Sequence, residues 1–223
     1  MILLIVFGLI FIVLFYIYNN YSRKKEIIEY FPKFFQEVYN CTSSGMSLIE
    51  AIRKSKNSYY GRLTPLIRNM CSQIEWGIPF SIALRNFSNK INDSFVNKVV
   101  TLTEKAANFS PDISKSIKDV NDYVTLTIDL ERERSLELFP QVVSIYFVFF
   151  VFLFIIYILF NFFITTFEAV EILFYKEVFK HLIIIEAILA GLVLGKISED
   201  SYLAGVKHLI FLLSFSIVFI LII

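Results

Sequence analysis

Apolar residues in this chain are gathered into long runs that contain almost no charge. Residues 2–18, 142–166 and 209–223 have no charged side chain, and residues 182–195 have only Glu186. Soluble domains interleave apolar and polar residues, whereas a membrane-spanning helix needs about 20 apolar residues in succession. We therefore predict an all-α, polytopic membrane protein with four transmembrane helices. The run at 142–166 has the full length, and the last two runs are the shortest.

Basic residues flank these runs unevenly, and this imbalance predicts the topology. One side has only Lys176 and Lys180, next to three glutamates. The other side has seven basic residues: Arg23, Lys24, Lys25, Arg132, Arg134, Lys196 and Lys207. Because basic loops tend to stay in the cytoplasm, we place this second side inside the cell and the N-terminus outside it. The first run has no basic region before it and no small-residue cleavage site, which is typical of an anchor and not of a cleaved signal peptide.

The predicted boundaries follow from this topology. We expect a helical domain at residues 20–138 in the cytoplasm, between the first two anchors. The other segments are transmembrane helices at 1–19, 139–166, 181–195 and 208–223, an external loop at 167–180 and a cytoplasmic loop at 196–207.

The predicted cytoplasmic domain contains an internal repeat with an offset of 32 residues. The segment from Gly45, with Ala51 six residues later, is echoed by the segment from Gly77 with Ala83, and a degraded third copy begins at Ser110. Glycine ends a helix by adopting a left-handed conformation at little steric cost. Apolar residues at helical spacing flank these positions. Each copy is therefore predicted to be a helix, a tight turn and a second helix, which together make a cytoplasmic bundle of about six helices built from helical hairpins.

Capping residues predict where the second helix of each copy begins. Ser47 and Glu50 have the spacing of a capping box, and Pro79 suits the first helical position. In the third copy, Ser110 is the expected cap, followed by a first-turn proline and a first-turn acid. Polar linkers at 56–62 and 88–93 are expected between the copies. A helical-hairpin array of the tetratricopeptide kind has a similar period, but its motif residues are absent here.

These turns resemble the F-domain of type II secretion and type IV pilus systems, which belongs to the membrane platform protein. Residues 31–38 are similar to the opening of that domain, and the segments from Gly45 and Gly77 are similar to its two glycine turns. Residues 191–208 resemble the archaeal pattern G-x-x-x-G-K-x-S-E-G-S-x-x-x-G-x-K-H, found in proteins that serve the archaellum and archaeal pili. The likeness covers most of residues 25–210.

Three features depart from the family pattern. Ser110 stands where a third glycine is common, and Asp200 stands where the loop usually has glycine. Archaeal members often carry two such domains in tandem, whereas this chain has one. The chain is thus expected to be a single-domain member, the second half of a longer protein, or a protein that pairs with a partner half.

The resemblance implies a non-catalytic platform in the cell membrane, with its F-domain in the cytoplasm. Such a platform couples a hexameric secretion ATPase to the insertion of pilin or archaellin-like subunits into a filament for motility or adhesion. It implies a homodimer or pairing with a second F-domain, no cofactor and no nucleic-acid partner. Two other classes stay open: a membrane-tethered helical-repeat scaffold for other partners, and a transporter subunit. The run at 142–166 has few of the polar residues that a transporter places at mid-membrane.

The sequence contains no motif for catalysis, cofactor binding or metal binding. His181 and His208 have no ligands at metal-binding spacing, and Cys41 and Cys71 lack CxxC spacing. The segment 191–198 is not a phosphate-binding loop, because its glycines are one residue too close and an isoleucine replaces the magnesium-binding hydroxyl.

Small residues in the third apolar run predict close helix packing. Ala187, Gly191 and Gly195 stand four apart, so they share one face of a helix that another helix can approach closely. Glu186 lies in the same run, and it is open whether this acid is functional or sits near the membrane boundary marked by His181.

The charge distribution predicts a surface for the ATPase. Residues 23–68 carry a net charge of +5 and residues 112–137 a net charge of −3, and such asymmetry can orient a docking partner. The candidate contacts are five basic residues around the first hairpin: Arg53, Lys54, Lys56, Arg62 and Arg68. The alternatives are that these side chains are merely solvated, or that the contact lies near Asp119 and Asp122.

Overall fold

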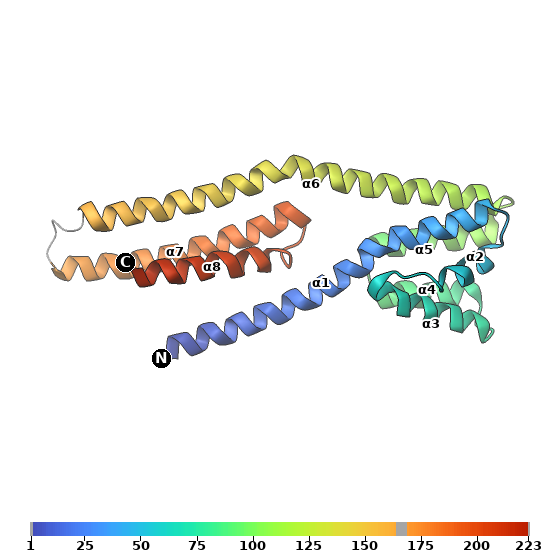
Figure 1. Ribbon diagram of the computed structural model, residues 1–223, viewed down its shortest axis with the longest axis horizontal. Helices are drawn as coiled ribbons and strands as arrows, with labels where there is room; N and C mark the ends of the chain where they lie inside the picture. Colours follow the sequence, from blue (N-terminus) through green and yellow to red (C-terminus); the bar gives the residue numbers. More distant parts are fainter. Residues whose placement is uncertain (1, 164–168, 223) are drawn as a thin grey trace. The chain divides into compact units, whose positions relative to one another are not determined.

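The computed structural model describes residues 2–163 and 169–222, and over these residues it contains eight α-helices and no β-strand. The chain divides into two compact units, one formed by Ser22–Arg132 and one by Met1–Tyr21 together with Glu133–Ile223. Helices α1 (Ile2–Ser43) and α6 (Ile113–Ile158) each contribute to both units (Figure 1). The all-α class predicted from the sequence is confirmed.

The unit Ser22–Arg132 is a bundle of six helices, which can be followed in Figure 1. Its members are the second half of α1, α2 (Leu48–Ser55), α3 (Thr64–Glu75), α4 (Phe80–Ile91), α5 (Ser94–Phe109) and the first part of α6, with a short 3₁₀ turn, η1 (Gly61–Leu63), before α3. Helix α3 packs against α4, and α4 packs against α5.

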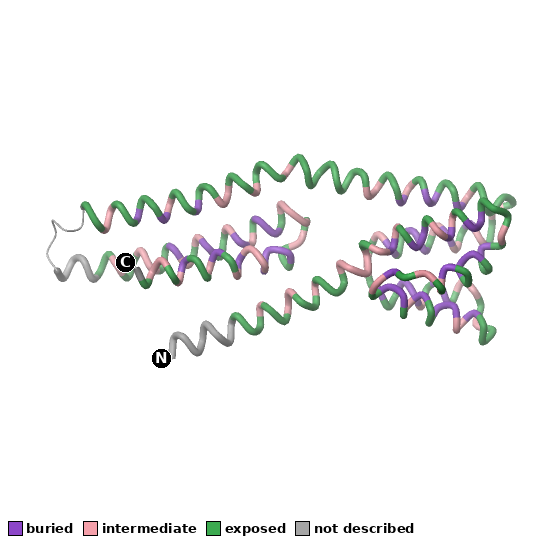
Figure 2. The backbone as a smooth tube through the Cα atoms, in the orientation of Figure 1, coloured by how far each residue is buried: buried purple, intermediate pink, exposed green. Residues whose placement is uncertain are grey.

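Aromatic side chains on α1 form the centre of this bundle. Phe31, Phe34, Phe35 and Val38 are spaced for one helix face, and all four are buried. The ring of Phe31 stacks on Phe87 of α4 with 6.5 Å between the ring centres. Figure 2 shows buried residues gathered on the inward faces of the bundle helices. The helices are therefore held together by an apolar core of their own.

A partly buried polar network attaches the linker after α2 to α1. The hydroxyl of Tyr60 donates to the Glu37 carboxylate, and the Ser58 hydroxyl donates to the same carboxylate at 2.9 Å. The backbone N–H of Tyr60 donates to Thr64 Oγ1 at 2.8 Å. Burial and the neighbouring Glu37 raise the pKa of Tyr60, so its hydroxyl stays a donor.

The second predicted linker is wrong in extent. Helix α4 continues to Ile91, and only two residues, Asn92 and Asp93, separate it from α5. Ile91 is buried in the bundle core, which favours the extra helical turn. Asn92 then ends the helix with φ +51°, and the Asp93 side chain accepts from the N–H of Phe95 at 3.0 Å. Asparagine suits the left-handed end of a helix and aspartate suits an N-cap. The polar residues at 88–93 are therefore compatible with one helix that ends and another that begins almost at once.

In the other unit, three helices pack around a separate apolar core. They are the second part of α6, α7 (Ala169–Glu199) and α8 (Gly205–Ile222), with a π-helical turn, η2 (Leu159–Phe163), at the end of α6. The core joins Phe149 and Leu153 of α6 to Ile183 and Leu194 of α7 and to Leu212 of α8. Among the described residues, two helices contain stretches long and apolar enough to cross a membrane, Ile113–Phe162 and Phe174–Glu199. Helix α8 is apolar but shorter, over Gly205–Leu221.

Helix α7 is longer than the transmembrane segment predicted at 181–195. It begins at Ala169, so the described part of the predicted external loop is helical, and it continues to Glu199. Helix α8 likewise begins three residues before the predicted start at 208. Residues 164–168 of the predicted second crossing and external loop lie outside the described residues, as do Met1 and Ile223 at the ends of the first and last crossings.

Candidate functional site

The α1–α2, α3–α4 and α5–α6 turns lie at one end of the bundle (Figure 1). Side-chain contacts mark the opposite end, where the chain enters at Ser22. There, Lys24 Nζ donates to the carbonyl of Asn92 at 2.6 Å, and Arg62 pairs with Glu26 at 2.8 Å. The three turns therefore form a surface at the end farthest from Ser22, here called the turn surface.

Gly45 and Gly77 end α1 and α3 in the same conformation. Their φ angles are +91° and +85°, as the repeat predicts. The N–H of Gly45 donates to Thr42 O at 3.0 Å, and the next N–H donates to Cys41 O at 3.2 Å. The same pair of bonds follows Gly77, at 3.1 and 3.0 Å, so each turn is a Schellman motif. A Cβ at either glycine would meet nothing within 4 Å. The glycines are thus required for their backbone conformation and not for lack of space.

The helices that follow these glycines begin close to their predicted positions. Ser47 and Glu50 form the predicted capping box. The backbone N–H of Glu50 donates to Ser47 Oγ at 3.3 Å, and the backbone N–H of Ser47 donates to Glu50 Oε2 at 3.2 Å. Hydrogen bonds from Ser47 lower the pKa of Glu50. Pro79 occupies the N-cap of α4, one residue before its predicted place. Ala51 and Ala83 are completely buried, so α2 and α4 lie close to their neighbours.

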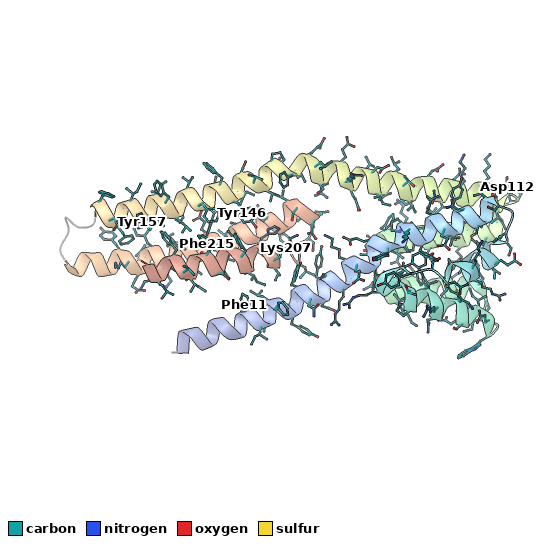
Figure 3. The ribbon with its side chains drawn as sticks, viewed as in Figure 1. Phe11, Asp112, Tyr146, Tyr157, Lys207 and Phe215 are labelled. Atoms are coloured by element: carbon teal, nitrogen blue, oxygen red, sulfur yellow. The ribbon has the colours of Figure 1, made fainter. Side chains whose placement is uncertain are left out.

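The predicted cap at Ser110 is wrong. Helix α6 begins at Ile113, and Asp112 caps it by accepting from the Lys115 N–H at 3.0 Å. Ser110 instead follows α5 in an extended conformation, and its hydroxyl contacts Asp112 O and Ser116 Oγ. A carboxylate accepts an N-cap hydrogen bond well and interacts favourably with the helix dipole, which gives Asp112 the advantage. Asp112 lies where α6 begins, on the turn surface (Figure 3).

The structure does not bring the five candidate ATPase contacts together. Arg53 and Lys54 lie exposed in the last turn of α2, and Arg68 is exposed on α3. Lys56 pairs with Glu75 at 2.6 Å and lowers the pKa of that carboxylate. Arg62, paired with Glu26, lies at the end opposite the turn surface.

Two exposed aromatic residues on the turn surface were missed by the sequence analysis. Trp76, the only tryptophan of the chain, is 84% exposed at the end of α3, and Phe109 is 83% exposed at the end of α5. Each lies immediately before a turn motif, at Gly77 and Ser110. Trp76 lies outside the helical spacing of the buried apolar residues of α3, which predicts an exposed side chain. This departure is the signal by which the sequence could have marked Trp76 as a surface residue.

Helices α7 and α8 form a tight hairpin along the predicted small residues. A Cβ at Gly195 would clash with the backbone of Gly205, and one at Gly191 would lie 2.7 Å from Leu209 Cα. Ala187 is completely buried on the same face. The predicted stripe of Ala187, Gly191 and Gly195 therefore lies where the structure packs α8 onto α7.

Charged side chains gather at the turn of this hairpin. The Asp200 carboxylate pairs with Lys196 at 2.6 Å and with Arg134 at 3.5 Å, and both cations lower its pKa. Asp200 has φ +51°, a left-handed conformation that explains why glycine suits this position in the family pattern. Lys207 pairs with Glu199, whose Oε2 also accepts from the Tyr21 hydroxyl at 3.1 Å. Burial and Glu199 raise the pKa of Tyr21 to about 12.

The histidine that ends the motif, His208, connects this turn to α6. The Nδ1 of His208 lies 2.6 Å from the Tyr146 hydroxyl, and its Nε2 lies 3.5 Å from Ser198 Oγ. Tyr146 and Lys207 are labelled near this turn in Figure 3. Within the described residues no group of histidine, cysteine or acidic side chains could hold a metal ion. The motif residues 191–208 thus act together as a structural turn that holds α6, α7 and α8 in place.

The helical bundle, the apolar helices and the polar hairpin turn define an all-α membrane protein with a hairpin-repeat domain. Residues 34–160, more than half of the chain, match the family described as type II secretion system (T2SS), protein F. The chain belongs to this family.

A curated relative comes from an archaeon. An uncharacterized protein of Methanocaldococcus jannaschii is 26% identical over 218 residues, which cover 94% of this chain and 36% of that protein. The chain thus spans little more than a third of the relative's length. No solved structure matches the chain.

Proposed function

We propose that this protein is a non-catalytic membrane platform for assembly of an archaellum or a type IV pilus-like filament. Its bundle receives the motion of a cytoplasmic hexameric secretion ATPase, and its membrane helices transmit that motion to pilin-like subunits. Membership in the T2SS protein F family is the observation that carries the proposal, because members of this family are generally platforms and not enzymes. The archaeal relative supports the archaeal branch.

The turn surface is suited to docking a protein ring. Trp76 and Phe109 expose large aromatic rings there, and Arg53 and Lys54 add positive charge from α2. Tryptophan and arginine are enriched among residues that dominate binding energy, and basic side chains steer an acidic partner. We therefore assign the ATPase contact to Trp76, Arg53 and Lys54, with Arg68 as a further candidate. Arg62 and Lys56 are left out because acidic neighbours already pair with them.

This contact predicts a binding result for the whole protein in nanodiscs. Replacing both Arg53 and Lys54 by glutamate should weaken association with the cognate ATPase by at least about tenfold and flatten its salt dependence, because two attractive charges become repulsive. Trp76→Ala should weaken association to a similar extent without changing the salt dependence, since a buried aromatic contact is not screened. Binding is measured by fluorescence titration across a salt series.

The control is reversal of Lys115 and Lys118, which follow the α5–α6 turn on α6 and lie outside the assigned contact. Binding should then change by less than about twofold. Unchanged affinity in the Arg53/Lys54 and Trp76 variants would contradict the assigned contact, and it would favour the acidic segment around Asp119 and Asp122.

The proposed orientation predicts a labelling pattern. A cysteine at exposed Asn57 of the bundle should react with a membrane-impermeant maleimide only after the cells are opened, whereas one at Glu177 should react in intact cells. The native thiols of Cys41 and Cys71 are buried and form a low background. Labelling at Asn57 from outside intact cells would contradict a cytoplasmic bundle.

A further inference from the structure

Helix α1 is one continuous helix that belongs to both units of the chain. Its 42 residues, Ile2–Ser43, rise by 1.5 Å each and so extend over about 60 Å. The second half of α1 is fixed in the bundle, because Phe31 and Phe35 are buried in the bundle core. Tyr21 lies at the middle of the helix, and it is the last residue of the membrane unit before the bundle begins at Ser22.

The membrane half of α1 is not part of the apolar core of its own unit. That core joins α6, α7 and α8, and among the residues that the structure describes it includes no side chain of α1. Most side chains at 11–20 are exposed, including Phe11 at 47% and Tyr16 at 73%. Core packing therefore fixes α6, α7 and α8 relative to one another but does not fix this part of α1 against them.

A hydrogen bond ties the middle of α1 to the α7–α8 turn. The Tyr21 hydroxyl donates to Glu199 Oε2 at 3.1 Å. Burial and the neighbouring Glu199 carboxylate raise the pKa of Tyr21, so the hydroxyl keeps its proton and remains a donor. A hydrogen bond to an ionised acceptor is stronger than one between neutral groups. This contact therefore holds α1 at a point where apolar packing does not.

The acceptor of this hydrogen bond is itself fixed to the three-helix core. Glu199 pairs with Lys207 of α8, and the Glu199 side chain is only 17% exposed. The next residue, Asp200, pairs with Arg134 of α6 at 3.5 Å. The turn that holds Tyr21 is thus connected to α6 and α8 as well as to α7.

Helix α6 also runs from the bundle into the membrane unit, but it contains a point where it can bend. Pro140 lies inside the helix, seven residues after Glu133, where α6 enters the membrane unit. Proline has no N–H to donate along the helix. The Ser144 hydroxyl donates to Pro140 O at 2.9 Å, and bonds of this kind often bend helices further. Helix α6 therefore does not hold α1 rigidly in one orientation.

We propose that Tyr21 and Glu199 form a pivot, about which α1 swings against the core of α6, α7 and α8. Because α1 is continuous and the pivot lies at its middle, displacement of the bundle half swings the membrane half. The inference rests on the proposed function in one respect, namely that the ATPase supplies the displacement. The pivot then converts motion of the bundle into motion of one membrane helix, while the three-helix core stays assembled.

Spin-label distances in the whole protein in nanodiscs test the pivot. One pair of labels is placed at exposed Asn19 of α1 and exposed Leu203 of the turn, near the pivot. A second pair, at exposed Val13 and Val218, joins the membrane half of α1 to α8. The distance distribution should be at least about twice as wide for the second pair, because the amplitude of a swing grows with distance from its pivot. Equal widths for the two pairs would overturn the proposal.

Removal of one hydroxyl tests the residues assigned to the pivot. Tyr21→Phe keeps the ring, and Glu199 keeps its pair with Lys207. The width for labels at 19 and 203 should increase about twofold, because the tether is lost. The matched control is Tyr16→Phe, an exposed tyrosine of the same helix, which should leave the width unchanged.

An unchanged width in the Tyr21→Phe variant, or equal broadening in the two variants, would overturn the proposal. Both measurements use the chain without the ATPase. A failure of the ATPase titration would therefore contradict the proposed function, whereas the distance distributions decide about the pivot.

Discussion

Gly195→Val is expected to separate helices α7 and α8 at the end where they meet. A Cβ at this position would occupy the space of the Gly205 backbone and lie 2.9 Å from Ser201 O. Backbone atoms cannot rotate away as a flexible side chain can, so the two helices must move apart. Inserting atoms into a packed interior usually costs about 1–3 kcal/mol, and we expect the upper end of that range. The ion pairs of Lys196 and Lys207 at the hairpin turn would be strained as well.

Limited trypsin digestion in lipid vesicles measures this opening, because Lys196 and Lys207 flank the turn. When opening is faster than cleavage, the cleavage rate follows the population of the open form. About 3 kcal/mol corresponds to roughly a hundredfold faster cleavage. Val193→Ile is the matched control, since it enlarges an exposed residue of the same helix. Equal cleavage rates for the two variants would contradict close packing at Gly195.

Replacing Gly45 and Gly77 by valine is expected to destabilise the bundle strongly. Both positions have positive φ, where a β-branched residue is unfavourable by about 1–2 kcal/mol or more. The turns belong to different hairpins, so the effects should add to about 2–4 kcal/mol. This is a large part of the 5–15 kcal/mol by which a typical domain is stable.

The two buried cysteines report unfolding of the bundle alone. Cys41 and Cys71 both lie in its core, and burial raises the pKa of the Cys71 thiol, which slows its reaction further. Thiol labelling at increasing urea concentration should therefore begin at a lower concentration in the valine variant. Asparagine at the same two positions is the control, because it tolerates the left-handed conformation and should lose less than half as much stability. Equal losses would show that the backbone conformation is not what glycine provides.

Features that depend on neighbouring residues could be predicted from the sequence. The glycine turns and the Ser47–Glu50 capping box follow from backbone sterics and hydrogen bonds within a few residues. The number of bundle helices followed from the repeat of these signals. Local reasoning failed where two local solutions compete, as at Ser110 and Asp112, which both suit a helix cap. It also failed at Ile91, where burial in the core extends a helix through polar residues.

The sequence by itself determined the class of protein, since segregated apolar runs and a hairpin repeat allow few other folds. Which side chains share a surface was decided only by the tertiary structure. Arg62 lies nine residues after Arg53 in the chain, but the linker between α2 and α3 runs back along α1 and carries it to the other end of the bundle. Likewise, the sequence placed Glu186 in an apolar run, but only the packing of α6 and α7 buried its Oε2 with no hydrogen-bond partner among the residues that the structure describes. Such positions depend on contacts between residues far apart in the chain, which local spacing does not encode.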